Sequence, residues 1–353
     1  PAQCCASCGA VATSTCSTCA IAPYCSHACH VADWRHHKLT CSAKVHVARV
    51  AGKGVGLIAL LDFAIGDELV REKPLVVLPG AECAGQPADS ARGAIARGAE
   101  TAAALALLPE AQHAAAMALL DAWHPGAPTP LGIARTNAVP LSTARGGSSR
   151  RSALFALTCR INHACKANAL YVWRDDLERE LVFAMRPIAA GEEITVSYHQ
   201  RYAPIAARKA ALAAGFNFDC CCTACAEHSA APADQATSDA RMRELQDTID
   251  AVPRVGYRDQ AGALEMCERV LQLMSAEGLD TPVDMGCIHY DAFQMARAIG
   301  DSERARAHID AACVCAAQCE GASSALTREY AAVAHKLGRS GEGPVRRLPS
   351  PCW

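Results

Sequence analysis

The first forty-one residues of the chain carry cysteine and histidine in closely spaced pairs, and no other feature limits the fold more narrowly. The pairs are Cys5/Cys8, Cys16/Cys19, Cys25/Cys29 and His37/Cys41. Eight such ligands suffice for two closed tetrahedral zinc sites, because each site takes four cysteine or histidine side chains. A segment this short cannot bury a hydrophobic core, so metal binding must supply its folding free energy, roughly 10–16 kcal/mol per site. We therefore expect an N-terminal zinc module, in which Cys4 could replace Cys5 only with a longer first loop.

A second set of cysteines joins two distant parts of the sequence. Cys165 lies in the segment Arg160–Asn168, which reads RINHACKAN, and Cys220, Cys222 and Cys225 follow much later. Four thiolates can hold one tetrahedral zinc ion and tie such segments together. Between them lies Gly191–Tyr198, reading GEEITVSY, an apolar run rich in β-branched residues that ends in a tyrosine. This pattern indicates a reaction site clamped by a metal.

Composition limits the cellular setting and the partners. The 21 cysteines occur in C-x2-C pairs with interleaved histidines, which favours zinc sites in a reducing compartment, the nucleus or the cytoplasm, over a secreted disulfide framework. The cysteines at 313, 315 and 319 lie in an alanine-rich helical pattern and are expected to be plain thiols. A net charge of −2 argues against a nucleic-acid-binding surface. No run of apolar residues is long enough for a membrane span, and no secretory leader is visible.

These motifs resemble those of SET-domain protein methyltransferases. RINHACKAN resembles the asparagine-histidine core of that family, GEEITVSY the strand that delivers the active-site tyrosine, and the late cysteine cluster the post-SET zinc segment. The chain has Ala164 where the family usually has serine and Ala167 where it usually has proline. The N-terminal pairs, with Trp34 ahead of His37, resemble a MYND zinc finger.

The resemblance implies an α+β architecture in three parts. Residues 1–42 would form the MYND finger, and residues 43–228 a β-rich SET domain. That domain would contain a helical insertion at about 80–150 and a post-SET zinc segment at about 215–228. Residues 229–353 would form a helical C-terminal region.

The resemblance also implies three structural zinc ions. In MYND fingers the pairs alternate between two metals, and the post-SET segment holds the third. The expected ligands are Cys5, Cys8, Cys25 and Cys29 for the first ion, Cys16, Cys19, His37 and Cys41 for the second, and Cys165, Cys220, Cys222 and Cys225 for the third.

By the same resemblance, the chain would transfer a methyl group from S-adenosylmethionine to a lysine side chain of a protein, histone or otherwise. Tyr198 would be the catalytic residue, and Lys53 would pair with the carboxylate of the donor. The expected donor-binding residues are Lys53, Gly54, Gly56, Asn137, Asn162, His163, Tyr198 and Phe218. The alternative is an inactive SET scaffold in which the MYND finger captures a peptide. In either case we expect a monomer.

Periodicity predicts the elements that carry these residues. Residues 45–78 read as strands, and Gly54-x-Gly56-x2-Ala59 within them superficially matches a dinucleotide fingerprint. That fingerprint requires a helix directly after the glycines, whereas Leu57–Phe63 reads as strand and turn. Ala91–Trp123 predicts two short helices divided at Pro109, followed by a loop over 125–140. A polar linker is expected over 230–238 and helices over 242–337, with breaks at the glycines 278, 300 and 321.

Overall fold

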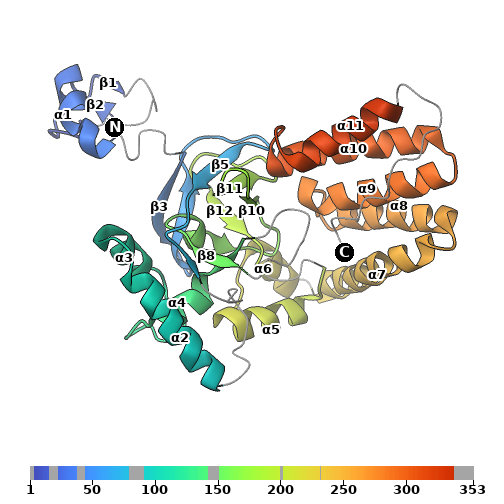
Figure 1. Ribbon diagram of the computed structural model, residues 1–353, viewed down its shortest axis with the longest axis horizontal. Coiled ribbons are helices and arrows are strands. Elements are labelled where there is room, and N and C mark those ends of the chain that lie inside the picture. The colour runs from blue at the N-terminus through green and yellow to red at the C-terminus, as the bar shows by residue number, and fades with distance from the viewer. Residues whose placement is uncertain are drawn as a thin grey trace.

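The computed structural model describes residues 4–15, 23–37, 44–78, 91–141, 151–198, 202–230 and 232–337, and it has the expected α+β architecture (Figure 1). Cys16, Cys19 and Cys41 lie outside these residues, and the side chain of His37 is not described. The second predicted zinc site of the N-terminal module therefore lies outside the described residues.

The N-terminal module is a short hairpin followed by one helix. Strands β1 (Ser14–Thr15) and β2 (Pro23–Tyr24) pair antiparallel, and α1 (His27–His37) follows directly. Its apolar interior amounts to Tyr24 and the cysteines around it. The Tyr24 hydroxyl donates to Asp33 at 2.7 Å, which fixes the helix on the hairpin.

Three small sheets form the centre of the molecule. The orders are β3-β4-β12-β9, β10-β11-β5 and β6-β8-β7. The strands are β3 (Val45–Val50), β4 (Gly54–Ala59), β5 (Glu68–Glu72), β6 (Val76–Leu78), β7 (Val139–Pro140), β8 (Ser152–Leu154), β9 (Asn162–His163), β10 (Ala169–Arg174), β11 (Arg179–Ala184) and β12 (Glu193–Val196). Because Gly54–Ala59 is a strand, the dinucleotide-binding interpretation is excluded, as expected.

One pairing brings the two sequence motifs together. Strand β12 pairs antiparallel with β4 and parallel with β9, with Thr195 opposite Asn162 and Val196 opposite His163. The buried side chains of these strands, including Leu57 and Ile194, form an apolar core with Val182 of β11. The end of β12 therefore delivers Tyr198 beside the Asn162-His163 pair.

The helical insertion lies on one side of the sheets and consists of α2 (Ala91–Ala106), α3 (Glu110–Met117) and α4 (Pro130–Asn137). The break at Pro109 is confirmed. The expected loop over 125–140 was wrong, because α4 occupies half of it and β7 its last two residues. The signal was present in the sequence: Thr129 accepts a hydrogen bond from the Gly132 N–H at 3.0 Å and Pro130 takes the first helical position, which is a favourable helix start.

After the sheets the chain is helical. The elements are α5 (Ile205–Phe216), α6 (Thr223–Ala230), α7 (Pro232–Gly256), α8 (Gln260–Ala276), α9 (Pro282–Ala298), α10 (Ser302–Glu320) and α11 (Ala325–Leu337). The expected breaks at glycines 278, 300 and 321 are confirmed, and all three have positive φ. The expected polar linker was wrong, because α7 begins at Pro232. Its Ser238 is buried and donates to Glu277 at 2.7 Å. Polar residues of this stretch therefore form contacts inside the fold.

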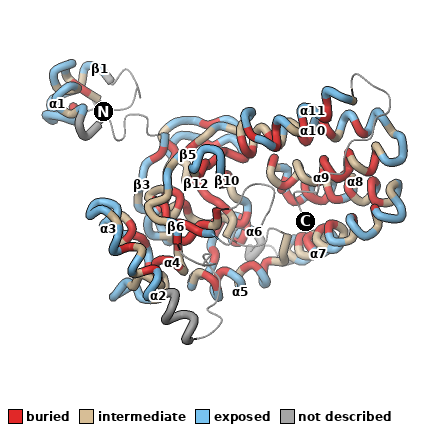
Figure 2. The backbone as a smooth tube through the Cα atoms, viewed as in Figure 1, coloured by how far each residue is buried: buried red, intermediate tan, exposed pale blue. Residues whose placement is uncertain are grey.

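The C-terminal helices pack on the central sheets. Figure 2 shows buried positions recurring along α8, α9 and α10, where they form one apolar cluster. Cys319 of α10 packs with Phe183 of β11 and with Met185, which directly follows that strand. The guanidinium of Arg174 donates to the Glu320 carbonyl at the end of α10 at 3.0 Å. Within the ranges described, the helices lack the length and apolar character needed to cross a bilayer.

Candidate functional site

A cavity of about 610 Å³ lies where five segments distant in sequence meet. They are the β3–β4 turn, the segment from α3 to α4, the short 3-10 helix η1 (Thr158–Arg160) with β9, the residues after β12, and the end of α5 with the stretch that follows it. Seven of the predicted donor-binding residues line it: Lys53, Gly54, Asn137, Asn162, His163, Tyr198 and Phe218. Gly56 does not.

Tyr198 is held at three points. Its hydroxyl donates to the backbone carbonyl of Ile161, and its N–H donates to Nδ1 of His163 at 3.1 Å. Its ring centroid lies 4.7 Å from that of Phe216. Burial, followed by the nearby Tyr171, raises the pKa of Tyr198 above its usual value, so the phenol stays neutral at physiological pH. Sequence reasoning missed Phe216, although Phe216-Asn217-Phe218 directly before Cys220 was a visible aromatic pair.

His163 connects this tyrosine to the cysteine cluster. Because its Nδ1 accepts the Tyr198 N–H, its Nε2 carries the proton in the neutral ring. That Nε2 lies 3.5 Å from the Cys165 sulfur. The imidazole is buried, with the Phe218 ring 6.1 Å away between centroids. His163 therefore acts as a rigid spacer between Tyr198 and Cys165.

A polar network occupies the wall beside the β3–β4 turn. The Lys53 amine lies 2.6 Å from Oε2 of Glu193, and Nδ2 of Asn162 donates to Oε1 of the same carboxylate at 2.9 Å. Asn162 also donates to the Val55 carbonyl at 3.2 Å. Lys53, predicted to meet the carboxylate of a donor, is thus paired with Glu193. Sequence reasoning did not weigh Glu193, although it lies within GEEITVSY.

Gly56 has a packing role. A Cβ at this buried position would lie 2.7 Å from Nδ2 of Asn162 and 2.7 Å from Cγ2 of Val50. Only glycine leaves room for the Asn162 amide to reach the Val55 carbonyl. The residue predicted to approach the donor instead makes space for a side chain that lines the cavity.

The opposite wall is made rigid by the end of α4 and the loop before it. The Asn137 amide donates to the carbonyls of Leu120 and Ile133 at 2.6 and 2.7 Å. Buried Asp121 accepts the N–H groups of Trp123, His124 and Thr129 at 2.9–3.0 Å. Burial alone would raise the pKa of Asp121, but these hydrogen bonds hold it below the usual value.

The four sulfurs of Cys165, Cys220, Cys222 and Cys225 gather beneath the cavity. They lie within 4.8 Å of one another, and all four residues are buried. Hydrogen bonding, first from Cys165 and then from the other two, holds the pKa of Cys220 well below its usual range. Four buried cysteine sulfurs, with no competing ligand type among them, are the donor set of a closed zinc site.

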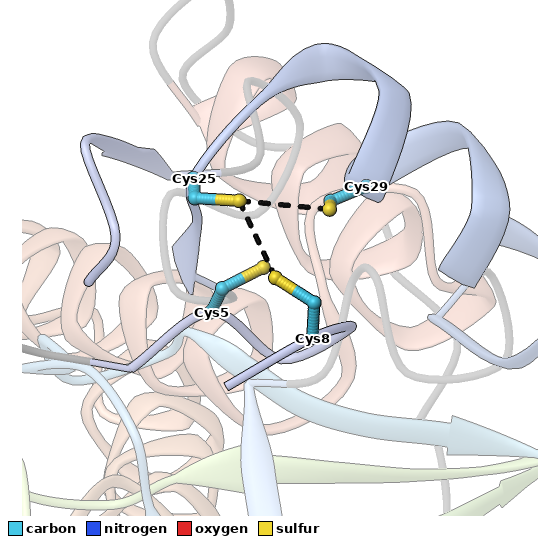
Figure 3. A group of neighbouring side chains, drawn as sticks. All are labelled: Cys5, Cys8, Cys25 and Cys29. Carbon is cyan, nitrogen blue, oxygen red and sulfur yellow. Dashed lines mark hydrogen bonds between the residues drawn. The ribbon is translucent and has the colours of Figure 1, made fainter. Parts of the chain in front are cut away.

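The N-terminal module holds a second cluster, formed by Cys5, Cys8, Cys25 and Cys29 (Figure 3). The Cys25 sulfur lies 3.5 Å from those of Cys8 and Cys29. This is possible because Cys25 precedes α1 and Cys29 is one helical turn further along. Cys5 is buried in the cluster whereas Cys4 is exposed, which agrees with the expected choice between them.

Comparison with known proteins agrees with this geometry. Residues 54–199 match the family model of the SET domain, and residues 5–41 match that of the MYND finger. The chain therefore contains a SET domain preceded by a MYND finger.

Named proteins of two organisms are similar to parts of this chain. The histone-lysine N-methyltransferase set5 of Schizosaccharomyces pombe is 27% identical over 260 residues, 73% of this chain and 73% of that protein. A SET and MYND domain-containing protein of Dictyostelium discoideum is 32% identical over 90 residues, 25% of this chain and 17% of that protein. The structure of the SET domain of LSMT bound to lysine and AdoHcy aligns over 87% of this chain and 90% of that chain, with 11% identity and a TM-score of 0.32.

Proposed function

We propose that the protein is an S-adenosylmethionine-dependent protein-lysine N-methyltransferase. The observation that carries the proposal is the single cavity into which β12, β9 and the segment after α5 bring Tyr198, Asn162, His163 and Phe218. The name of the fission-yeast relative supports lysine as the acceptor and makes histones the first substrates to test.

The residues of the cavity suit this chemistry. The donor, when bound, supplies an electrophilic methyl group on a sulfonium. A free lysine amine has a pKa near 10.4 and must lose its proton before it attacks. The rings of Tyr198, Phe216 and Phe218 provide apolar surface, which disfavours the ammonium form by desolvation. The Tyr198 hydroxyl, neutral and anchored to the Ile161 carbonyl, is placed to orient the amine, and alignment of the reacting groups lowers the entropic barrier.

The polar wall would hold the amino-acid end of the donor. Lys53 and Glu193 form an ion pair, and their side chains are 23% and 17% exposed to solvent, respectively. A zwitterionic amino acid offers a carboxylate to the lysine and an ammonium to the glutamate, so it can join this pair without leaving either charge alone. Asn162, already bonded to Glu193, would add an amide contact.

We also propose that both described cysteine clusters bind zinc, and that Cys16, Cys19, His37 and Cys41 bind a third ion. Zinc at the inner cluster would join the segment after β9 to the aromatic residues before Cys220. The MYND finger would bind a peptide partner. The protein would act as a monomer in the nucleus or cytoplasm.

Calorimetric titration with S-adenosylmethionine, followed by transfer of labelled methyl groups to core histones and to a protein array, tests the function. Binding together with labelled lysine would support it. The absence of any heat of binding, with a folded and zinc-loaded protein, would instead identify a scaffold whose remaining activity is peptide capture by the MYND finger.

A further inference from the structure

Glu72, the last residue of β5, anchors the turn that leads into the candidate active site. Its Oε1 accepts the Thr158 N–H and the Thr158 hydroxyl, both at 2.6 Å. Its Oε2 accepts the Leu157 N–H at 3.2 Å. Hydrogen bonds from backbone N–H groups to a carboxylate are stronger than those to a neutral acceptor. Glu72 therefore fixes the beginning of η1.

Two further hydrogen bonds connect this turn to Tyr198. The Ile161 N–H donates to the Thr158 carbonyl at 3.1 Å. The Ile161 carbonyl then accepts the Tyr198 hydroxyl. Asn162 and His163 follow Ile161 directly, so the position of η1 sets the position of both halves of the site.

A second carboxyl group lies directly across the sheet from Glu72. Strands β11 and β5 place Glu180 opposite Glu72. Glu180 is fully buried, and within the described chain neither of its carboxyl oxygens has a hydrogen-bond partner. Burial, followed by the charge of Glu72, raises the pKa of Glu180 to about 9.

Among the described residues, no positive charge compensates Glu180. Its neighbour on β10 is Trp173, and Glu72 is the one charged group of the described chain that acts on it appreciably. Cys159 of η1 interacts with both carboxyl groups, and burial, the largest influence, raises the pKa of its thiol. A buried charge without a partner is costly, so Glu180 keeps its proton at physiological pH.

We propose that Glu72 and Glu180 are a positioning pair for the methyl transfer, in which Glu72 holds the turn behind Tyr198 and Glu180 must stay protonated for it to do so. The proposal rests on the proposed function, because Tyr198 is taken as the catalytic residue. When Glu180 loses its proton at alkaline pH, two negative charges face each other across the strands, and the hold of Glu72 on Thr158 is weakened.

Glu180→Gln tests the role of the proton, because glutamine keeps the shape and cannot ionise. The quantity to measure is the ratio of kcat in the variant to kcat in the wild type, which cancels the ionisation of the substrate lysine. We expect a ratio near one at pH 7 that rises several-fold by pH 9.5. A ratio that stays flat across this range overturns the proposal.

Glu72→Gln and Thr158→Val test the anchor. Each should lower kcat about tenfold, as small misplacements of a reacting group do, while KM for the donor changes little. Thr158→Ser, which keeps the hydroxyl, should restore kcat. Glu68→Gln is the matched control, since Glu68 lies on the same strand but pairs with Arg71 at the surface. Equal losses in Glu72→Gln and Glu68→Gln, or no rescue by serine, would refute the role.

A readout without catalysis separates this proposal from the proposed function. In the unfolded chain Glu180 releases its proton near pH 4.5, but in the folded chain only near pH 9, so the contribution of Glu180 to wild-type stability must fall as pH rises between these values. We expect Tm to fall from pH 6.5 to 9 in the wild type and to fall less in Glu180→Gln. If Tm behaves this way and no methyl transfer is found in any protein, the proposed function has failed and the buried carboxyl pair stands. Identical Tm profiles would show that the pair itself is wrong.

Discussion

The hydroxyl of Tyr198 donates a hydrogen bond to the backbone carbonyl of Ile161, the residue before Asn162 and His163. One side chain thus ties the end of β12 to the start of β9, in addition to the parallel pairing of the two strands. The tyrosine is therefore fixed relative to the residues proposed to hold the donor, and its removal should separate catalysis from binding.

Tyr198→Phe should lower kcat by about 10²–10³, the range found when a single electrostatic contact to a transition state is removed. The Kd for S-adenosylmethionine should change less than about twofold, and the lost hydrogen bond should reduce the free energy of unfolding by about 1 kcal/mol. Labelled-methyl transfer, calorimetry and urea unfolding measure these quantities. Tyr257→Phe, at an exposed tyrosine, is the control and should change none of them.

Gly56→Ala should weaken both folding and donor binding. The new Cβ would meet Asn162 and Val50 at 2.7 Å, and overpacking of this kind costs about 1–3 kcal/mol. Displacement of the Asn162 amide should also raise the Kd for the donor. Gly126→Ala is the control, because a Cβ there has no atom within 4 Å. A Gly56→Ala protein with wild-type unfolding and affinity would contradict the close approach.

Cys165→Ser should remove one zinc ion per chain and abolish methyl transfer, since the cluster joins Cys165 to the segment before Cys225. Metal content by mass spectrometry and thermal unfolding are the measurements, and chelation of the wild type should have the same effect. Cys221→Ser, at an exposed thiol between two ligands, should keep the full metal content. Unchanged zinc content in Cys165→Ser would exclude this residue as a ligand.

The C-terminal helices should lose stability in mild acid. Nδ1 of His289 on α9 lies 3.0 Å from Nδ1 of His308 on α10, so the two rings cannot both be protonated in this geometry. Burial, with His308 adding to it, lowers the pKa of His289 from 6.5 to about 4. At His289 the unfolded chain therefore binds more protons between these values, and the contribution of this residue to stability falls as pH drops from about 6.5 to 4.

The size of this loss should be about 2 kcal/mol after allowance for solvent screening. Because Glu180 acts in the opposite direction over this interval, the quantity to measure is the difference in free energy of unfolding between the wild type and His289→Gln, obtained by urea unfolding at pH 7 and at pH 4.5. The wild type should lose about this much relative to His289→Gln as pH falls, whereas it should lose nothing relative to His113→Gln, on the distant helix α3. A difference between the wild type and His289→Gln that does not vary with pH would show that the histidine pair is not buried as described.

The sequence predicted the ligand clusters and most of the cavity because their residues occur in short motifs with fixed spacing. Cys220, Cys222 and Cys225 could be grouped by spacing alone. Glycines at 278, 300 and 321 could be recognised as helix ends because no other residue adopts positive φ so easily. Tyr198 could be placed beside Asn162 once the two motifs were matched to one family.

What could not be predicted depended on contacts across the fold. The pairing of Lys53 with Glu193 joins residues 140 positions apart, and no local pattern indicates it. The position of Gly56 in its motif suggested a residue that approaches a ligand. The structure shows instead that the Asn162 amide occupies the space a side chain would need. The polar stretch that begins at Pro232 is helical because Ser238 forms a hydrogen bond with the distant Glu277. In each case a tertiary partner decided the role of the residue.

The hydrogen bond from Arg174 to the Glu320 carbonyl bears on how fragments of this protein will behave. The Arg174 guanidinium, which is also paired with Asp176, lies at the C-terminal end of α10, where the helix dipole favours positive charge. Truncation after α6 would strip this contact and expose the apolar surface around Phe183 and Met185. A recombinant catalytic piece ending there is thus expected to aggregate, and intact protein should melt in a single cooperative step across both regions.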